Sequence, residues 1–281
     1  MKKFSIAHRL CLGVALAASV ATAAHAQSAD EAQKQATRLI SQAISERVSR
    51  SVDLSASGVE GDASRRSIWA LGSYSDLGFS GSHLADLYLG VGGFDKSFGD
   101  TVIGVSGSYA RAEFGSFGGF GLGHTDTLTV SPYGAIKLNP NVFLSGIVNL
   151  SYSAIPNFDD SVNLGTEVAL NAFTKTDKVV LRGKVAYRGS AGIDPSTDWQ
   201  STFLVFGEAE TKATDTISLY ANVEADWAII ENGDDFHPIY GGVGAYIRPS
   251  DRSQLGLGYQ RLFNGDGLEI STFTVQYRKV F

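Results

Sequence analysis

The chain has 281 residues, a formal net charge of −6 and a single cysteine. The acidic balance excludes a basic nucleic-acid-binding protein, and one cysteine excludes a disulfide framework. Glycine is frequent (32 residues) and proline rare (6), which excludes a proline-rich disordered chain.

Residues 1–26 have the order of a secretory signal peptide. A cationic start precedes an apolar run that is too short to span a bilayer, and the sequence AHA at residues 24–26 matches the small-residue cleavage pattern. We predict cleavage before Gln27. Because Cys11 lies inside this signal, the exported chain is predicted to contain no cysteine.

Residues 27–52 are predicted to form one amphipathic helix. Ser28 followed by Glu31 is a capping box, and apolar residues recur after it at helical spacing. The polar face of this helix is cationic and is expected to contact the rest of the protein through Lys34, Arg38, Arg47 and Arg50. Residues 53–66 are short, polar and glycine-containing, which indicates a linker.

From residue 67 to residue 281 the apolar residues alternate with a period of two, which is typical of strands. The pattern predicts twelve of them: 67–75, 84–95, 101–113, 126–138, 141–154, 163–174, 178–189, 199–212, 215–229, 236–248, 252–263 and 268–281. Pro132 falls inside one of these strands, and since proline cannot donate to the ladder we expect a bulge there.

One face of these strands is apolar and the other is polar or charged. The clearest case is ISLYANVEADWAI at residues 217–229. In a barrel the charged parity would face the lumen, which predicts lumen-facing charges at Arg182, Lys184, Arg188, Glu224 and Asp226. They would form either a charge ladder that receives the arginines of the helix or a selectivity surface for a solute.

The connections between strands distinguish a membrane barrel from a sandwich. Long segments, beginning with LGFSGS after the first strand, alternate with tight turns such as NP and PSD. Even strand number and long loops on one side are features of outer-membrane barrels. Because an unpaired backbone group in hydrocarbon costs several kcal/mol, such a sheet must close. The fold predicted is all-β, a twelve-stranded antiparallel transmembrane barrel.

The last strand ends on an aromatic residue. Phe273, Val275, Tyr277 and Phe281 share one parity. Closure of the barrel would pair this strand with the first one and prevent it from fraying. Tyr277 and Phe281 are expected near the membrane interface, where aromatic girdles occur.

A cationic helix followed by a twelve-stranded barrel with a terminal phenylalanine resembles the translocator domain of autotransporters. The resemblance implies location in the outer membrane of a Gram-negative bacterium, among lipid and lipopolysaccharide, with the helix inside the lumen. It also implies that Phe273, Val275, Tyr277 and Phe281 form a signal read by the outer-membrane assembly machinery. Lys279 departs from the usual pattern of this signal. Only Gln27 precedes the predicted helix cap, so we expect no passenger segment.

Two enzyme classes are alternatives to this interpretation. Asp235 and His237 form a D-x-H pair that resembles half of an omptin protease site, with Asp159 and Asp160 as the nearest second acidic pair. Omptin barrels, however, have ten strands. A solvated loop is the simpler interpretation.

An outer-membrane phospholipase would need a serine beside a histidine on one face. Ser82 and His83 are adjacent, and adjacent strand residues point to opposite faces; the remaining histidine, His124, lies beside another predicted loop. We therefore expect no catalytic residue, no metal and no cofactor. The predicted function is a non-enzymatic barrel plugged by its helix, and the alternatives are a small-solute channel and a surface protease.

Overall fold

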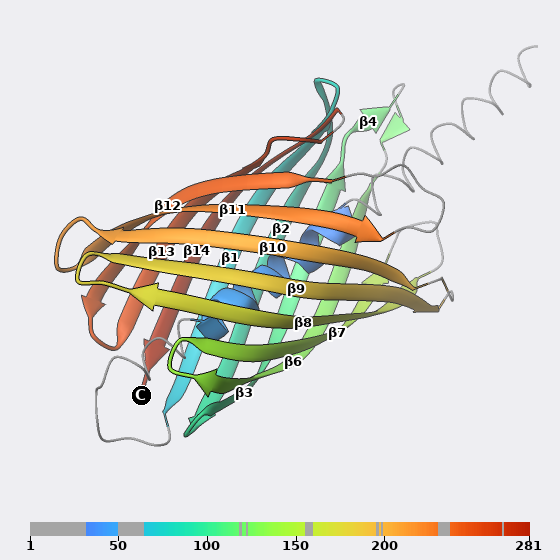
Figure 1. Ribbon diagram of the computed structural model, residues 1–281. Helices are drawn as coiled ribbons and strands as arrows, with labels where there is room; N and C mark the ends of the chain where they lie inside the picture. The colour runs from blue at the N-terminus through green and yellow to red at the C-terminus, as the bar shows by residue number, and fades with distance from the viewer. Residues whose placement is uncertain are drawn as a thin grey trace, which may run out of the picture.

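The computed structural model describes residues 32–49, 65–117, 120–121, 123–154, 160–194, 197, 199–229, 237–265 and 267–281. The predicted signal peptide and nearly all of the predicted linker lie outside these residues. The described part is a closed antiparallel barrel of twelve strands with one helix inside it (Figure 1). The predicted fold class is confirmed.

All twelve predicted strands are present. The barrel strands are β1 (Arg66–Phe79), β2 (Ser82–Phe98), β3 (Thr101–Phe114), β6 (His124–Asn139), β7 (Val142–Ala154), β8 (Ser161–Lys175), β9 (Val179–Asp194), β10 (Gln200–Lys212), β11 (Ile217–Ile229), β12 (Ile239–Ser250), β13 (Ser253–Leu262) and β14 (Leu268–Val280). The short strands β4 (Ser116–Phe117) and β5 (Phe120–Gly121) pair separately, within the connection from β3 to β6.

The first and last barrel strands close the sheet. β1 pairs with β14 in one continuous antiparallel register, from Ser67 opposite Val280 to Phe79 opposite Leu268. The amide of Phe281 donates to the carbonyl of Arg66 at 2.9 Å. The C-terminal residues are therefore held by the seam of the barrel, which accounts for a strand that continues to the end of the chain.

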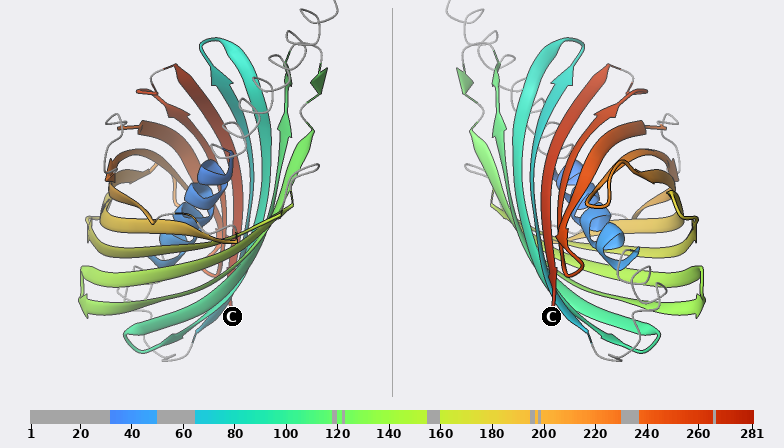
Figure 2. Two further views of the ribbon diagram at one scale, coloured as in Figure 1. Left: turned by 90° about the vertical axis from the view of Figure 1, so that its right-hand side faces the viewer. Right: turned by 90° about the vertical axis from the view of Figure 1, so that its left-hand side faces the viewer.

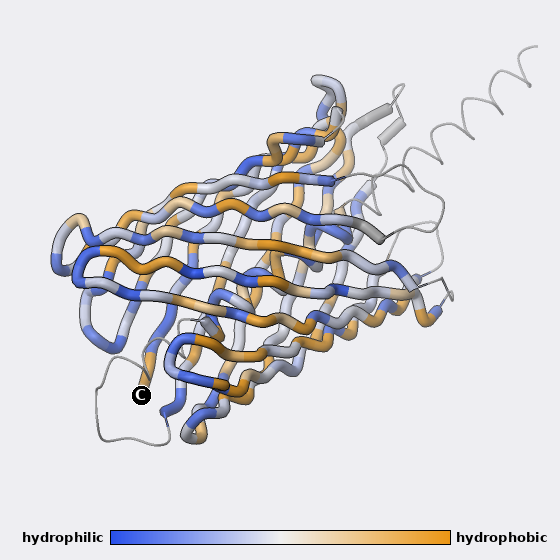
Figure 3. The backbone as a smooth tube through the Cα atoms, in the orientation of Figure 1, coloured by the Kyte–Doolittle hydropathy of each residue, from blue (hydrophilic) through white to orange (hydrophobic). Residues whose placement is uncertain are grey.

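The distribution of side chains is that of a membrane barrel. On β11, Leu219 and Val223 are 49% and 51% exposed, while Glu224 and Asp226 are buried inside. Figure 3 shows the same alternation of apolar and polar residues along the other strands. An outward face this rich in exposed apolar residues fits a lipid environment, because water would disfavour it.

Short turns gather at the end of the barrel that holds the C-terminus (Figure 1). Five connections there have two to four residues: 99–100, 140–141, 176–178, 213–216 and 251–252. In outer-membrane barrels the short turns face the periplasm. The opposite end, which carries most of the longer connections, is therefore the outer end.

The connection between the first two strands is not the long loop predicted from LGFSGS. β1 continues to Phe79 and β2 begins at Ser82, so Ser80 and Gly81 alone form the turn. Both have positive φ (49° and 80°), as two-residue hairpin turns of type I′ require. The long loop was wrongly predicted because both strands of the hairpin continue beyond their alternating apolar residues, toward the turn.

The predicted bulge at Pro132 is also wrong. Pro132 stays in register with Val105 on β3, and the register of β6 against β7 is the same before and after it. Between Val130 and Tyr133 the pairing of β6 with β7 is interrupted at two residues, one of which is Pro132. The strand accommodates the proline through this gap and has no inserted residue there. The bulge in this strand pair occurs later, between Lys137 and Asn139.

Residues 32–49 are helical and lie inside the barrel, as both side views in Figure 2 show. The apolar side of the helix, represented by Leu39, Ile40 and Ile44, belongs to one buried cluster with inward residues of the wall such as Leu89 and Phe143. Within the described residues, no helix is long and apolar enough to cross a membrane.

Candidate functional site

The lumen around the helix is the candidate functional site. One side of its wall is strongly charged, beginning with β9. Arg182 on this strand contacts Glu208 and Glu210 of β10 at 2.7 Å and 2.8 Å. Arg248 of β12 also pairs with Glu210. These pairs link three strands on the polar half of the lumen.

Glu167 of β8 is the next centre of the charge ladder. It is almost fully buried and contacts Lys184 at 3.1 Å and Arg188 at 2.9 Å. The hydroxyl of Ser45, on the helix, donates to the same carboxylate at 2.8 Å. Glu167 therefore connects the basic strand β9 to the helix.

Arg38 of the helix contacts three strands of the wall. Its Nε lies 3.0 Å from a carboxylate oxygen of Glu224 on β11. Its Nη2 donates to Gln260 of β13 at 2.6 Å. The guanidinium carbon lies 3.5 Å from the ring centre of Tyr240 on β12, a cation–π contact. One helix residue thus holds three neighbouring strands.

Glu224 depends strongly on this arginine. Its side chain is 0% exposed, and neither carboxylate oxygen accepts a hydrogen bond from the described residues. Asp226, two residues along the same face of β11, is also buried, and its Oδ1 likewise lacks a hydrogen-bond partner in the described part. A buried carboxylate in this state relies on a nearby cation for compensation.

Arg47 contacts a different wall. Its Nη2 lies 2.6 Å from Asp95 of β2 and also contacts Ser67 of β1. The hydroxyl of Tyr133 donates to Asp95 at 3.0 Å and accepts from the indole of Trp69 at 2.8 Å. This network places a buried charge within the otherwise apolar side of the lumen.

Asp95 was missed by the sequence reasoning, which placed the partners of the helix arginines on β11. A signal was present, because Asp95 interrupts the apolar parity that contains Leu87, Leu89 and Val91. A single acid on a buried apolar face needs a cationic partner.

Further side-chain hydrogen bonds add to the attachment of the helix. They join Gln35 to Thr272, Ser41 to Asn149, and Glu46 to Tyr246 and Gln276. Of the predicted helix contacts, Lys34 has an exposed side chain and Arg50 lies outside the described residues.

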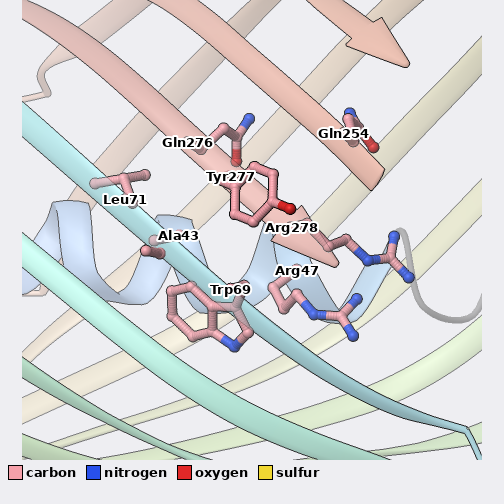
Figure 4. Close-up of a pocket in the computed structure, with 9 residues that line it drawn as sticks. Ala43, Arg47, Trp69, Leu71, Gln254, Gln276, Tyr277 and Arg278 are labelled. Carbon is pink, nitrogen blue, oxygen red and sulfur yellow. The ribbon is translucent and has the colours of Figure 1, made fainter. Parts of the chain in front are cut away.

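Two cavities flank the helix. One lies at the β1–β14 seam, where Trp69 and Leu71 of β1 and Gln276 and Arg278 of β14 surround Ala43 of the helix (Figure 4). The other lies on the polar side of the helix. Its lining includes Gln42, Ser45, Arg182, Lys184 and Glu208.

The residues considered for the assembly signal face outward. Phe273, Val275, Tyr277 and Phe281 are all exposed on the lipid side of the barrel. Lys279 lies on the same strand with its ammonium 5.2 Å from the ring centre of Phe281. A lysine in this position can extend its charge toward the interface while its stem covers apolar surface.

Of the four residues of the protease alternative, Asp160 and His237 lie within the described part of the chain. Asp159 and Asp235 lie outside the described residues, and Asp160 is exposed immediately before β8. The ring of His237 lies 6.4 Å from that of Trp227.

The other two histidines contact carboxylates. His83 contacts Asp76 at 3.0 Å and Asp86 at 3.5 Å, on the outside of the barrel. His124 contacts Asp126 at 3.3 Å.

Comparison with solved structures shows the same fold. The translocator domain of the autotransporter NalP from Neisseria meningitidis is 12% identical with a TM-score of 0.56, and the match covers 87% of this chain and 97% of that one. The β domain of the Bordetella autotransporter BrkA is 15% identical with a TM-score of 0.55, covering 78% and 99%. An outer-membrane channel from Pseudomonas putida F1 is 14% identical with a TM-score of 0.54, covering 80% and 97%.

A comparison with curated protein sequences finds no match. The family model described as the autotransporter beta-domain matches residues 59–202, about half of the chain. With a closed twelve-stranded barrel and an N-terminal helix, the chain belongs to the autotransporter β-domain family, whose members lie in the Gram-negative outer membrane.

Proposed function

We propose that this protein is a non-enzymatic translocator-type barrel whose pore is plugged by its N-terminal helix. The observation that carries the proposal is that the helix is attached to opposite sides of the wall. Arg38 pairs with Glu224 on β11, and Arg47 pairs with Asp95 on β2. Contacts with two opposite walls fix the helix within the lumen. A helix attached to one wall only could swing away from the pore axis.

The two halves of the lumen match the two faces of the helix. Apolar wall residues pack against Leu39, Ile40 and Ile44, and the charged wall meets the polar face through Ser45 and Arg38. Departure of the helix would expose apolar surface to water and leave Glu224 without its arginine. Both effects favour the plugged state.

The non-enzymatic character is supported by the histidines. A nucleophile must lie within hydrogen-bond reach of its base. His83 contacts Asp76 and Asp86, and His124 contacts Asp126. In each case the partner is a carboxylate, whereas a serine hydrolase requires a serine hydroxyl at that position, so these contacts argue against the phospholipase alternative. Hydrolysis of lipid or peptide substrates by the purified barrel would contradict this part of the proposal.

Conductance in planar bilayers tests the plug. The mature protein should conduct weakly, and a variant lacking residues 28–52 should conduct far more, with preference for cations because Glu224 and Asp226 would line the opened lumen. Heat-modifiable migration in detergent gels verifies that both proteins fold. Equal conductance would place the helix outside the conducting path and contradict the proposal.

A small-solute channel is the second candidate function. It is favoured by the polar cavity between Gln42 and Ser45 of the helix and Arg182 and Lys184 of β9. A water-filled path beside the helix would follow this cavity. Solute-dependent swelling of liposomes that contain the intact protein would support the channel, and the absence of swelling would contradict it.

The outward C-terminal residues suggest how the barrel is assembled. We propose that Phe273, Val275, Tyr277 and Phe281 are read by the outer-membrane assembly machinery before β14 pairs with β1. All four lie on the lipid-facing parity, where they are accessible without interrupting the lumenal contacts of the strand. In the folded barrel they contact lipid, and lipopolysaccharide is the lipid we expect at the outer end.

A further inference from the structure

The outer end of the β1–β2 hairpin has an irregularity that reorients one side chain. The register shifts between Leu77 and Gly78, so that Gly78 pairs with His83 and Leu84 becomes the extra residue of a bulge. With a regular register Leu84 would stand opposite Gly78 and His83 would point inward. The bulge instead moves His83 to the outward face and lets Leu84 pack against the core.

His83 then meets two carboxylates. Asp76 and Asp86 stand directly opposite each other on β1 and β2. His83 Nδ1 lies 3.0 Å from Asp76, and its Nε2 lies 3.5 Å from Asp86. Each of the three side chains offers one atom that could bind a metal ion, and these three atoms all lie within 4.8 Å of one another. Within the described part of the chain, this is the one group of histidine and acidic side chains that meets this condition.

The pairing of two acids on one face calls for a cation. Like charges directly opposite each other destabilise a strand pair. Two ionised carboxylates on one face carry a charge of about −2, which one divalent ion would neutralise.

The geometry supports coordination. Nitrogen and oxygen ligands lie about 2.0–2.2 Å from zinc, so two ligands of one ion are separated by roughly 3–4 Å. In the structure Asp76 and Asp86 contact different ring nitrogens of His83. Coordination of one ion therefore requires rotation of these exposed side chains until a single nitrogen faces both carboxylates. The hydroxyl of Tyr74 donates to Asp86 at 2.6 Å and orients this carboxylate from outside the ligand set.

We propose that Asp76, His83 and Asp86 form a surface site for a divalent metal ion of the zinc and transition-metal class, with zinc as the expected ion. The histidine nitrogen selects a transition metal over magnesium or calcium, which prefer all-oxygen ligands. The site faces outward at the outer end of the barrel, beyond the cross-strand pair of Tyr74 and Tyr88. It is accessible from the cell exterior and separate from the lumenal helix.

Isothermal titration calorimetry of the detergent-solubilised mature protein with zinc chloride tests the site. The wild type should bind one zinc ion per barrel. His83→Gln should weaken this binding at least tenfold. His124→Gln is the matched control, because His124 is also an outer histidine beside a carboxylate, but there Arg111 provides a cation near Asp126.

A second measurement uses the wild type alone and does not depend on folding of a variant. Zinc should protect His83, and not His124, from modification by diethylpyrocarbonate, read by mass spectrometry. The proposal is overturned if zinc does not bind, if His83→Gln binds zinc as tightly as the wild type, or if excess magnesium or calcium displaces the zinc. Equal protection of both histidines would also overturn it.

Discussion

Replacing Arg38 with methionine tests whether buried charge pairing holds the helix in the lumen. Methionine keeps most of the length of the side chain and removes its charge. Glu224 would remain 0% exposed, with neither oxygen hydrogen-bonded by a described residue. Removing one partner of a buried ion pair costs about 3–5 kcal/mol. If this free-energy cost falls on the docking of the helix, the ratio of undocked to docked helix rises by roughly two to four orders of magnitude.

The assay is the open fraction of single channels in planar bilayers at one fixed voltage. Arg38→Met should open far more often than the wild type. The double variant Arg38→Met/Glu224→Gln removes both charges of the pair and should return most of the way to wild-type behaviour, since Glu224 is then no longer a buried charge that has lost its arginine. Lys34→Met is the control on the same helix. Lys34 has an exposed side chain, so its loss should cost less than about 1 kcal/mol.

An unchanged open fraction for Arg38→Met would refute the reasoning, because Glu224 would then be compensated without the arginine. A double variant that opens as often as the single variant would also refute it. In that case the loss of hydrogen bonding to Gln260 and of the contact with Tyr240 would explain the effect.

Three further predictions concern the barrel. The protein should fractionate with outer membranes and migrate faster unheated than boiled in detergent gels, and recovery as a soluble periplasmic protein would contradict the membrane assignment. Deletion of Phe281, or replacement of Tyr277 and Phe281 by serine, should lower the outer-membrane level while export continues, as immunoblots of cell fractions can show. Gly104→Ala should destabilise the barrel by about 1–3 kcal/mol in urea unfolding, because a Cβ there would lie 2.3 Å from the ring of Tyr133, whereas Gly107→Ala, with nothing within 4 Å, should not.

The barrel could be predicted from the sequence because alternation is a local property. On residues 217–229, the placement of Glu224 and Asp226 on one face and Val223 on the other follows from the period of two alone. Closure followed from the cost of unpaired backbone groups in lipid, and it explains why the strand that ends at Phe281 is held.

The ends of the elements were less predictable. The long loop expected after the first strand is a two-residue turn at Ser80 and Gly81, and Pro132 remains in register where a bulge was expected. Neither feature can be predicted from the alternation of apolar and polar residues. A strand can continue past its apolar section, and the ladder of hydrogen bonds can accommodate a missing donor without a change of register.

Lumenal partners depend on the tertiary structure. The sequence alone indicated that Arg38 and Arg47 would seek acidic partners, yet it could not distinguish Glu224 from Asp95 as the partner of Arg47. The choice depends on the stagger of the strands around the barrel and on the rotation of the helix within it, which together determine which inward side chains reach the same height. The same holds for His83, whose approach to Asp76 depends on a one-residue bulge. Alternation determines which face a residue occupies, and register determines which neighbour it meets there.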